Sequence, residues 1–309
     1  MKKSKKLMIL GLSAATACVA ATSAVSSFAW FATSGTVSAS GMKVKASADE
    51  YLQIKYAYTG TSETPATPTY PSTATSYFDW TTSTNKNANS YNSVELNMAS
   101  AKVLKPTSLI KELETDNKTI KTDFANGDTA HKWVSAIGTS SVDGSKKADD
   151  VYTDITSTAD LGEKEDTTSA NGYTLVVDYD IRLLNLGDTT TNYDLKAAID
   201  WTTPSSSTTE GFKLRKAARV FVMIGDNYDE TITSTEGTEG YEFSYTSGSW
   251  TAATTIKEDL HANASDKGVR VRTFFFFDGE DAEAKTVNVV TTEIYSYNIT
   301  FSVTKHSGN

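Results

Sequence analysis

The chain contains three histidines, His131, His261 and His306, which are the first candidates for catalysis or metal binding. A helical zinc-protease site needs two histidines four residues apart, so that both project from one helix face. The three histidines are far apart in the sequence, and only His261 follows acidic residues, in the segment Glu258-Asp259-Leu260-His261. Their spacing therefore argues against a zinc site, and we expect His261 to lie in a surface loop.

Other signatures of catalysis are also absent from the sequence. Cys18 is the only cysteine and lies in the apolar N-terminal segment, so the rest of the chain has no cysteine nucleophile. Gly-x-Ser-x-Gly, Walker and dinucleotide-binding fingerprints do not occur. We therefore predict that the protein is not an enzyme and uses no cofactor.

Two acidic clusters are candidate calcium sites, because this cation prefers several carboxylate and carbonyl oxygens. Each cluster directly follows a strongly apolar segment of the chain. The candidate ligands are Asp226, Asp229, Asp278, Glu280 and Asp281. Asn, Asp and Gly are also the residues that a turn after a buried strand requires. We favour the turn interpretation and predict no metal site.

Aromatic residues offer a further candidate site, a groove for carbohydrate. Tyr295, Tyr297, Phe301 and the block Phe274 to Phe277 supply the rings, but strand alternation assigns most of them to a core. The segment from Tyr70 to Trp80 carries four aromatic residues in polar surroundings. It is the better candidate for contact with a partner.

Apolar and polar residues alternate along much of the chain, which predicts β-strands. In 173–183 the apolar residues share one face, while Asp178, Asp180 and Arg182 share the other, which we expect to be wet. Further strands are expected at 42–46, 52–56, 195–201 and 295–303.

Two segments, Ala217 to Ile224 and Val269 to Phe277, are apolar on both faces over part of their length. This pattern is typical of central strands that are covered on both sides. Ser108 to Leu113 is the one helical candidate, and the sequence allows this helix to extend to Trp133. Together these patterns favour an all-β fold, an antiparallel jelly-roll-like β-sandwich with long polar loop insertions and a minor helix.

The N-terminus has the pattern of a secretory signal peptide. Four lysines between residues 2 and 6 precede an apolar run from Leu7 to Ala21, and small residues stand at Ser27 and Ala29. We expect cleavage after Ala29, although the pattern also allows cleavage after Ala24 or a retained anchor. The expected organisation is a signal peptide at 1–29, an N-terminal strand at 30–46, and one sandwich domain at 47–309 with insertions near 59–80 and 106–170.

The composition excludes several classes of partner. The net charge is −9 and the isoelectric point is about 5.0, whereas nucleic acids and anionic membranes attract basic patches. Without cysteines in the mature chain, disulfides cannot stabilise it, so a large apolar core must do so. We expect no nucleic-acid binding and no stable membrane span after processing.

The junction after the signal peptide resembles that of the camelysin and TasA group of secreted Gram-positive proteins. The likeness is carried by Ala29, by the aromatic pair Trp30-Phe31, and by Thr36-Val37-Ser38 with Gly41. The usual Ser-Asp after the aromatic pair is Ala32-Thr33 here. This resemblance implies a jelly roll and a fibre-forming matrix protein in which the freed N-terminal segment adds as a strand to the next subunit.

From these patterns we predict a secreted structural protein of the cell surface or extracellular matrix. It would associate with itself through the N-terminal strand, as in β-augmentation. The residues that would serve this assembly are Trp30, Phe31, Val37, Met42 and Val44. A simpler interpretation is that this strand packs only in its own sheet. The patterns also leave open a monomeric adhesin that binds glycan or another surface protein, and a camelysin-like metallopeptidase.

Overall fold

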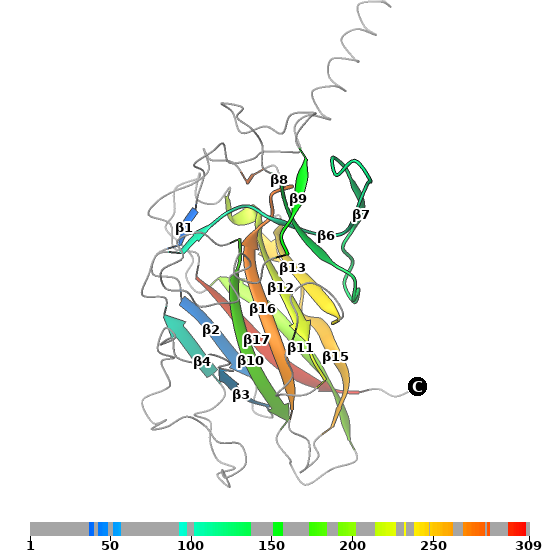
Figure 1. Cartoon of the computed structure of the whole chain (residues 1–309). Helices are drawn as coiled ribbons and strands as arrows, with labels where there is room; N and C mark the ends of the chain where they lie inside the picture. The colour runs from blue at the N-terminus through cyan, green and yellow to red at the C-terminus, as the bar shows by residue number, and fades with distance from the viewer. Residues whose placement is uncertain are drawn as a thin grey trace, which may run out of the picture.

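The computed structural model in Figure 1 is built almost entirely from β-strands, with a single short helical turn at residues 214–216 among the residues described. The prediction of an all-β fold with a minor helix is therefore confirmed. The structure describes residues 37–39, 43–48, 52–56, 93–97, 102–136, 151–156, 173–183, 191–201, 214–226, 232, 238–246, 248–261, 268–281, 283–284 and 296–306.

One layer of the fold is a six-stranded antiparallel sheet in the order β14-β13-β12-β16-β10-β3. In that order its strands are Ser249–Trp250, Gly240–Thr246, Ala218–Ile224, Val269–Phe277, Leu175–Leu183 and Leu52–Tyr56. Every residue of β12 and β16 is buried, so the prediction that these are central strands covered on both faces is confirmed.

The opposing layer is a five-stranded sheet in the order β15-β11-β17-β2-β4. Its strands are Thr254–His261, Asn192–Trp201, Tyr297–Lys305, Lys43–Ala48 and Ser93–Asn97. All its pairings are antiparallel except that of β17 with β2, which is parallel. A small separate pair joins β1 (Val37–Ala39) to β5 (Lys102–Leu104).

The main hydrophobic core lies between these two sheets. Leu195, Ala197 and Ile199 of β11 belong to the same buried cluster as Val177, Tyr179 and Ile181 of β10. Aromatic rings also meet across the core: the centroids of Phe275 and Tyr297 are 5.2 Å apart in a stacked arrangement. The sandwich expected from the strand alternation is therefore present.

A third layer covers the outer face of the six-stranded sheet. This layer, which we call the accessory sheet, has the order β7-β6-β8-β9, with strands Ile120–Asp123, Ser108–Leu113, Lys132–Ala136 and Tyr152–Asp154. Figure 1 shows it across one end of the sandwich. The insertion expected at 106–170 thus contains a packed sheet, whereas the polar composition predicts loops there.

The prediction of a helix at Ser108–Leu113 is wrong, because this segment is strand β6. Its apolar residues are buried in two separate clusters. Leu109 joins a second core with Trp133, Phe221 and others, while Ile110 joins a third small cluster with Val134 and Tyr152. Successive residues of a strand point to opposite faces, so β6 buries these two side chains in separate clusters.

The prediction of a wet face on β10 is also wrong, because Asp178 is 8% exposed and Asp180 only 2%. Each carboxylate pairs with the arginine that lies opposite it on β16. Asp178 Oδ1 lies 2.7 Å from Arg272 Nε, and Asp180 pairs with Arg270. Buried charges are tolerated when they are paired and hydrogen-bonded. The strand alternates as its sequence indicates, but its polar face is covered.

Candidate functional site

The N-terminal strands, which carry the predicted assembly residues, pair within their own chain. Val37 of β1 lies opposite Leu104 of β5, and Val44 of β2 lies between Tyr297 of β17 and Leu96 of β4. Trp30, Phe31 and Met42, the remaining predicted assembly residues, lie outside the described part of the chain, as does the expected cleavage position at Ala29.

The space that β2 fills is a strand-shaped slot between β17 and β4. The parallel ladder runs from Tyr297 opposite Val44 to Phe301 opposite Ala48, and the antiparallel ladder joins β2 to β4 over five residues. Ala46 at the centre of β2 is fully buried in the main core. The slot therefore bonds the backbone of β2 along both of its edges and buries at least one of its side chains.

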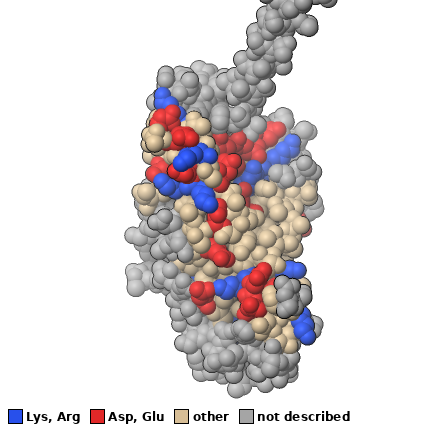
Figure 2. All heavy atoms as spheres, turned by 90° about the vertical axis from the view of Figure 1, so that its right-hand side faces the viewer, with Lys and Arg blue, Asp and Glu red and all other residues tan. Residues whose placement is uncertain are grey.

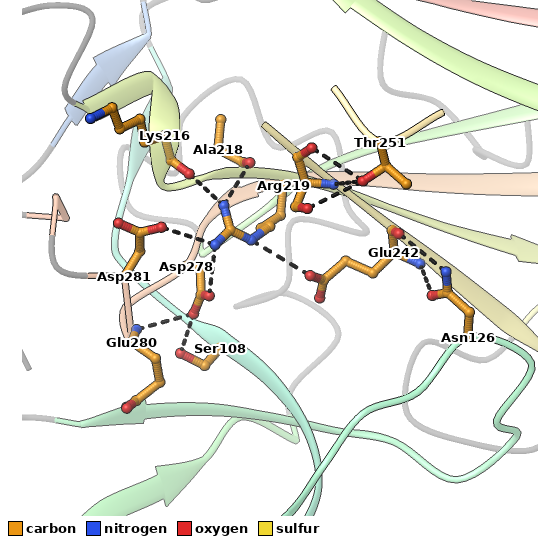
Figure 3. A network of polar contacts seen from close by, with 11 residues as sticks. Ser108, Asn126, Lys216, Ala218, Arg219, Glu242, Thr251, Asp278, Glu280 and Asp281 are labelled. Atoms are coloured by element: carbon orange, nitrogen blue, oxygen red, sulfur yellow. Dashed lines mark hydrogen bonds and ion pairs between the residues drawn. The ribbon is translucent and has the colours of Figure 1, made fainter. Parts of the chain in front are cut away.

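A second notable site is a cluster of carboxylates around Arg219 on β12, shown in Figure 3. Arg219 Nη2 lies 3.0 Å from Asp281 Oδ2 and 3.4 Å from Asp278 Oδ2, and Arg219 Nε lies 3.5 Å from Glu242 Oε1. Nη1 donates to the carbonyl oxygens of Lys216 and Ala218. One guanidinium thus faces three carboxylates.

This cluster joins the accessory sheet to the sandwich. Ser108 of β6 donates its hydroxyl hydrogen to Asp278 Oδ1 at 2.8 Å, and the same oxygen accepts the backbone N–H of Glu280 at 3.0 Å. Thr107 N donates to the carbonyl oxygen of Phe277 at 3.0 Å. The carboxylates therefore act as a structural junction between two layers.

Burial and like charges shift the acid–base behaviour of the cluster. Burial, reinforced by the neighbouring carboxylate of Asp278, raises the pKa of Glu242 to about 7 against the opposing effect of Arg219. Burial likewise raises the pKa of Asp278, again against the attraction of Arg219. The pKa of Tyr152 is raised by burial and by its hydrogen bond to Glu280. Negative charge in this junction is therefore costly.

The calcium candidates are divided between different contacts. Asp278 and Asp281 bond to Arg219, Glu280 accepts from the Tyr152 hydroxyl, and Asp226 pairs with Lys257. Asp229 lies outside the described residues. In the part of the chain that the structure describes, no group of three or more His, Cys, Asp or Glu side chains is arranged to hold a metal ion.

His131 lies apart from the other two histidines, whereas His261 and His306 flank Asn192 of β11 at one end of the five-stranded sheet. His131 is buried in the second core, with its ring edge-on to Phe221 at a centroid distance of 5.1 Å. His261 ends strand β15 and pairs with Asn192 of β11, so it lies in a strand and not in the expected loop. His306 Nδ1 lies 2.6 Å from Asp194 Oδ1, and this hydrogen bond raises the pKa of His306.

The aromatic stripe considered for a glycan groove is part of the core. Tyr297, Phe301 and all four residues of the block Phe274 to Phe277 are completely buried. Tyr295 and the segment from Tyr70 to Trp80 lie outside the described residues. On the described face in Figure 2, acidic and basic side chains are mixed in two groups, with an uncharged surface between them.

Comparison with known proteins gives no relative to guide the interpretation. No family model matches the chain, and neither does any curated protein or solved structure. Among the described residues, the structure contains no helix both long and apolar enough to cross a membrane. The assignment of function therefore depends on the chain's own residues and contacts.

The sequence reasoning missed two residues of the carboxylate cluster, Arg219 and Glu242. Arg219 lies within an apolar run, and Glu242 lies in strand β13, a segment for which no strand was expected. Nothing in their local sequence indicates that they would meet Asp278. A single charged residue inside a fully apolar strand was the one available signal, since such a residue needs a buried partner.

Proposed function

We propose that the protein is a secreted, non-enzymatic structural protein of the cell surface or extracellular matrix. In this proposal it associates with further copies of itself by exchanging its N-terminal strand. The signal-peptide pattern supports export, and the arrangement of β2 supports the mode of association.

The observation that carries the proposal is the parallel insertion of β2 between β17 and β4. Parallel neighbours need a long crossover connection, and here one partner comes from the beginning of the chain and the other from its end. The backbone hydrogen bonds of the slot are the same whichever copy supplies β2. A second copy can therefore fill the slot without any new type of contact.

The contacts that hold β2 in its slot stabilise whichever arrangement forms, the closed monomer or the exchanged assembly. Full burial of a side chain the size of valine or larger stabilises by roughly 1.5–3 kcal/mol, and each exchanged strand also carries its backbone hydrogen bonds. In strand exchange, the contacts that close the monomer form between two copies instead. Linking the chains therefore loses few contacts relative to the monomer.

Removing the exchanged segment tests the proposal. Mature protein without residues 30–48, which lacks both β1 and β2, should stay monomeric in sedimentation velocity and form no fibres in electron micrographs, while keeping a β-type circular dichroism spectrum and a cooperative melt. Val37→Asp should weaken assembly in the same direction, because the N-terminal segment is exchanged as a whole and Val37 pairs opposite the buried Leu104 of β5, where a carboxylate is unfavourable. Val37→Thr, which keeps the shape without the charge, is the matched control.

The proposal also predicts where the secreted protein begins. N-terminal sequencing should start at Trp30, because Ser27 and Ala29 provide the small residues that signal peptidase requires. A start at Val25, or an intact Met1, contradicts this part of the proposal. A mature parent protein that remains monomeric at high concentration contradicts the assembly itself.

A further inference from the structure

Beyond its short pairing with β14 at Tyr245 and Thr246, the outer edge of strand β13 is sealed by groups that do not belong to strands. In an antiparallel strand, the backbone groups of alternate residues point to opposite neighbours. In β13, Tyr241 and Phe243 lie opposite Val222 and Val220 of β12. The N–H groups of Gly240, Glu242 and Ser244 point the other way, because each donates to a group outside β12. Without those groups, the backbone of these three residues would be open to another strand.

The side chain of Asn126 occupies the centre of this edge, as Figure 3 shows. Its Oδ1 accepts the backbone N–H of Glu242 at 2.7 Å, and its Nδ2 donates to the carbonyl oxygen of Glu242 at 3.4 Å. A side-chain amide carries the same donor and acceptor pair as a peptide group. Asn126 thus makes the two bonds that one residue of a neighbouring strand would make.

The two remaining positions of the edge are closed in a similar way. Gly127 N donates to the carbonyl oxygen of Gly240 at 2.9 Å, and Gly240 N donates to that of Asp128 at 3.2 Å. At the other end, Ser244 N donates to Thr251 Oγ1 at 3.0 Å, and Thr251 N donates to the carbonyl oxygen of Ser244 at 2.9 Å. The outward N–H and C=O groups of Gly240, Glu242 and Ser244 are thus all bonded.

The turn that supplies Asn126 is held firmly in place. Asp128 N donates to the carbonyl oxygen of Ala125 at 3.0 Å, and Lys111 Nζ lies 2.9 Å from Asp128 Oδ1. The ring of Phe124 packs edge-on against Phe221 of β12, with centroids 5.2 Å apart. The turn is therefore anchored both to the accessory sheet and to the outer face of the six-stranded sheet.

We propose that residues 124–128 and Thr251 form an edge guard, which keeps β13 from pairing with a strand of a second copy of the chain. An unpaired sheet edge is a template for such pairing, and proteins commonly cover edges to prevent it. The biological role of the guard rests on the proposed strand exchange: by closing the β13 edge, the guard confines association to the β2 slot. The physical claim about the β13 edge stands without that role.

Hydrogen exchange at single amides tests the guard in the full mature chain. Asn126→Ala should speed exchange of the Glu242 amide roughly threefold to tenfold, the effect of losing one hydrogen bond. The amides of Tyr241 and Phe243, on the β12 side, should keep their rates. Thr251→Val, which removes the hydroxyl at nearly constant shape, should speed exchange of Ser244 and leave Glu242 unchanged. Lys121→Ala, on β7 of the accessory sheet, is the control and should change none of these amides.

Sedimentation velocity tests whether an unguarded β13 edge pairs with a second copy of the chain. The measurement uses a Val37→Asp background, because that substitution weakens exchange of the N-terminal strand. Adding Asn126→Ala and Thr251→Val together should produce concentration-dependent oligomers in which the Glu242 amide is protected again. An unchanged Glu242 exchange rate in Asn126→Ala, or a protein that stays monomeric with both edge substitutions, overturns the guard. Neither result affects the strand-exchange proposal, which is measured separately by the loss of assembly in Val37→Asp alone.

Discussion

The carboxylate of Glu242 should make the protein less stable at alkaline pH than at mildly acidic pH. Burial and the nearby Asp278 raise its pKa from 4.5 to about 7, so the folded protein holds a proton more tightly than the unfolded chain does. A raised carboxyl pKa destabilises the fold once the group ionises. Stability from this group is therefore greatest below 4.5 and declines as the pH rises to about 7.

The magnitude follows from the size of the pKa change. Each pKa unit corresponds to about 1.4 kcal/mol, so a rise from 4.5 to about 7 means that ionised Glu242 costs at most about 3.5 kcal/mol. Solvent screens part of this cost, because 27% of the Glu242 side-chain surface is exposed. We expect Glu242→Gln to be more stable than the parent by about 1–3 kcal/mol at pH 8, with little difference near pH 5.

Urea unfolding of the parent and of Glu242→Gln at several pH values between about 5 and 8 measures this difference. Other groups that titrate in this range, including His306, are present in both proteins and largely cancel in the comparison. Glu112→Gln, which removes a carboxylate from a surface pair with Lys121, is the matched control. A Glu242→Gln protein that is less stable than the parent at pH 8 would refute the reasoning.

Three further predictions concern other parts of the fold. Arg272→Met should lower the free energy of unfolding by about 3–5 kcal/mol in urea titrations, because it leaves Asp178 charged and buried without its partner; an unchanged midpoint would contradict this. Gly240→Ala should lower the free energy of unfolding by roughly 1–3 kcal/mol in the same assay, since the added Cβ would lie 2.2 Å from the ring of Phe221. An unchanged free energy of unfolding would show that this ring can move freely. In NMR titrations the pKa of His306 should lie above its usual 6.5 and should fall in Asp194→Asn, which removes the main cause of the shift; equal values in both proteins would argue against the pair.

Strands with a clear periodic pattern were predictable from the sequence. β10, β11 and β17 alternate, and β12 and β16 are largely apolar, so these strands and the central position of β12 and β16 followed from the sequence pattern alone. The early strands β2 and β3 were also correctly expected.

The accessory sheet was not predictable because its strands gain their burial from distant segments. Leu109 and Trp133 are buried against Phe274 and Phe276 of β16, a contact that no local pattern shows. The same holds for Asp178 and its neighbours on β10, whose polar face reads as solvated until its arginine partners on β16 are known. Tertiary contacts of this kind routinely override local propensity.

The candidate sites were predictable only in part. The turn-forming acids after β16 were identified as a cluster, but their partner Arg219 was not, since charge pairing across a fold leaves no spacing signal. The edge contact made by Asn126 was equally hidden, because an asparagine before a glycine reads simply as a turn. Polar residues with long-range partners therefore required the structure.

One cross-linking measurement tests strand exchange most directly. Thr300 of β17 lies opposite Ser47 of β2 in the parallel ladder, and directly paired residues on neighbouring strands are close enough for a disulfide. The mature chain beginning at Trp30 contains no cysteine, so one chain with Ser47→Cys and another with Thr300→Cys can be mixed under mild oxidation. Strand exchange predicts a disulfide-linked heterodimer in the mixture and no linked dimer when either chain is oxidised alone. If the two chains stay unlinked, while a chain carrying both substitutions closes its disulfide internally, the strand remains in its own subunit and the proposed assembly is wrong.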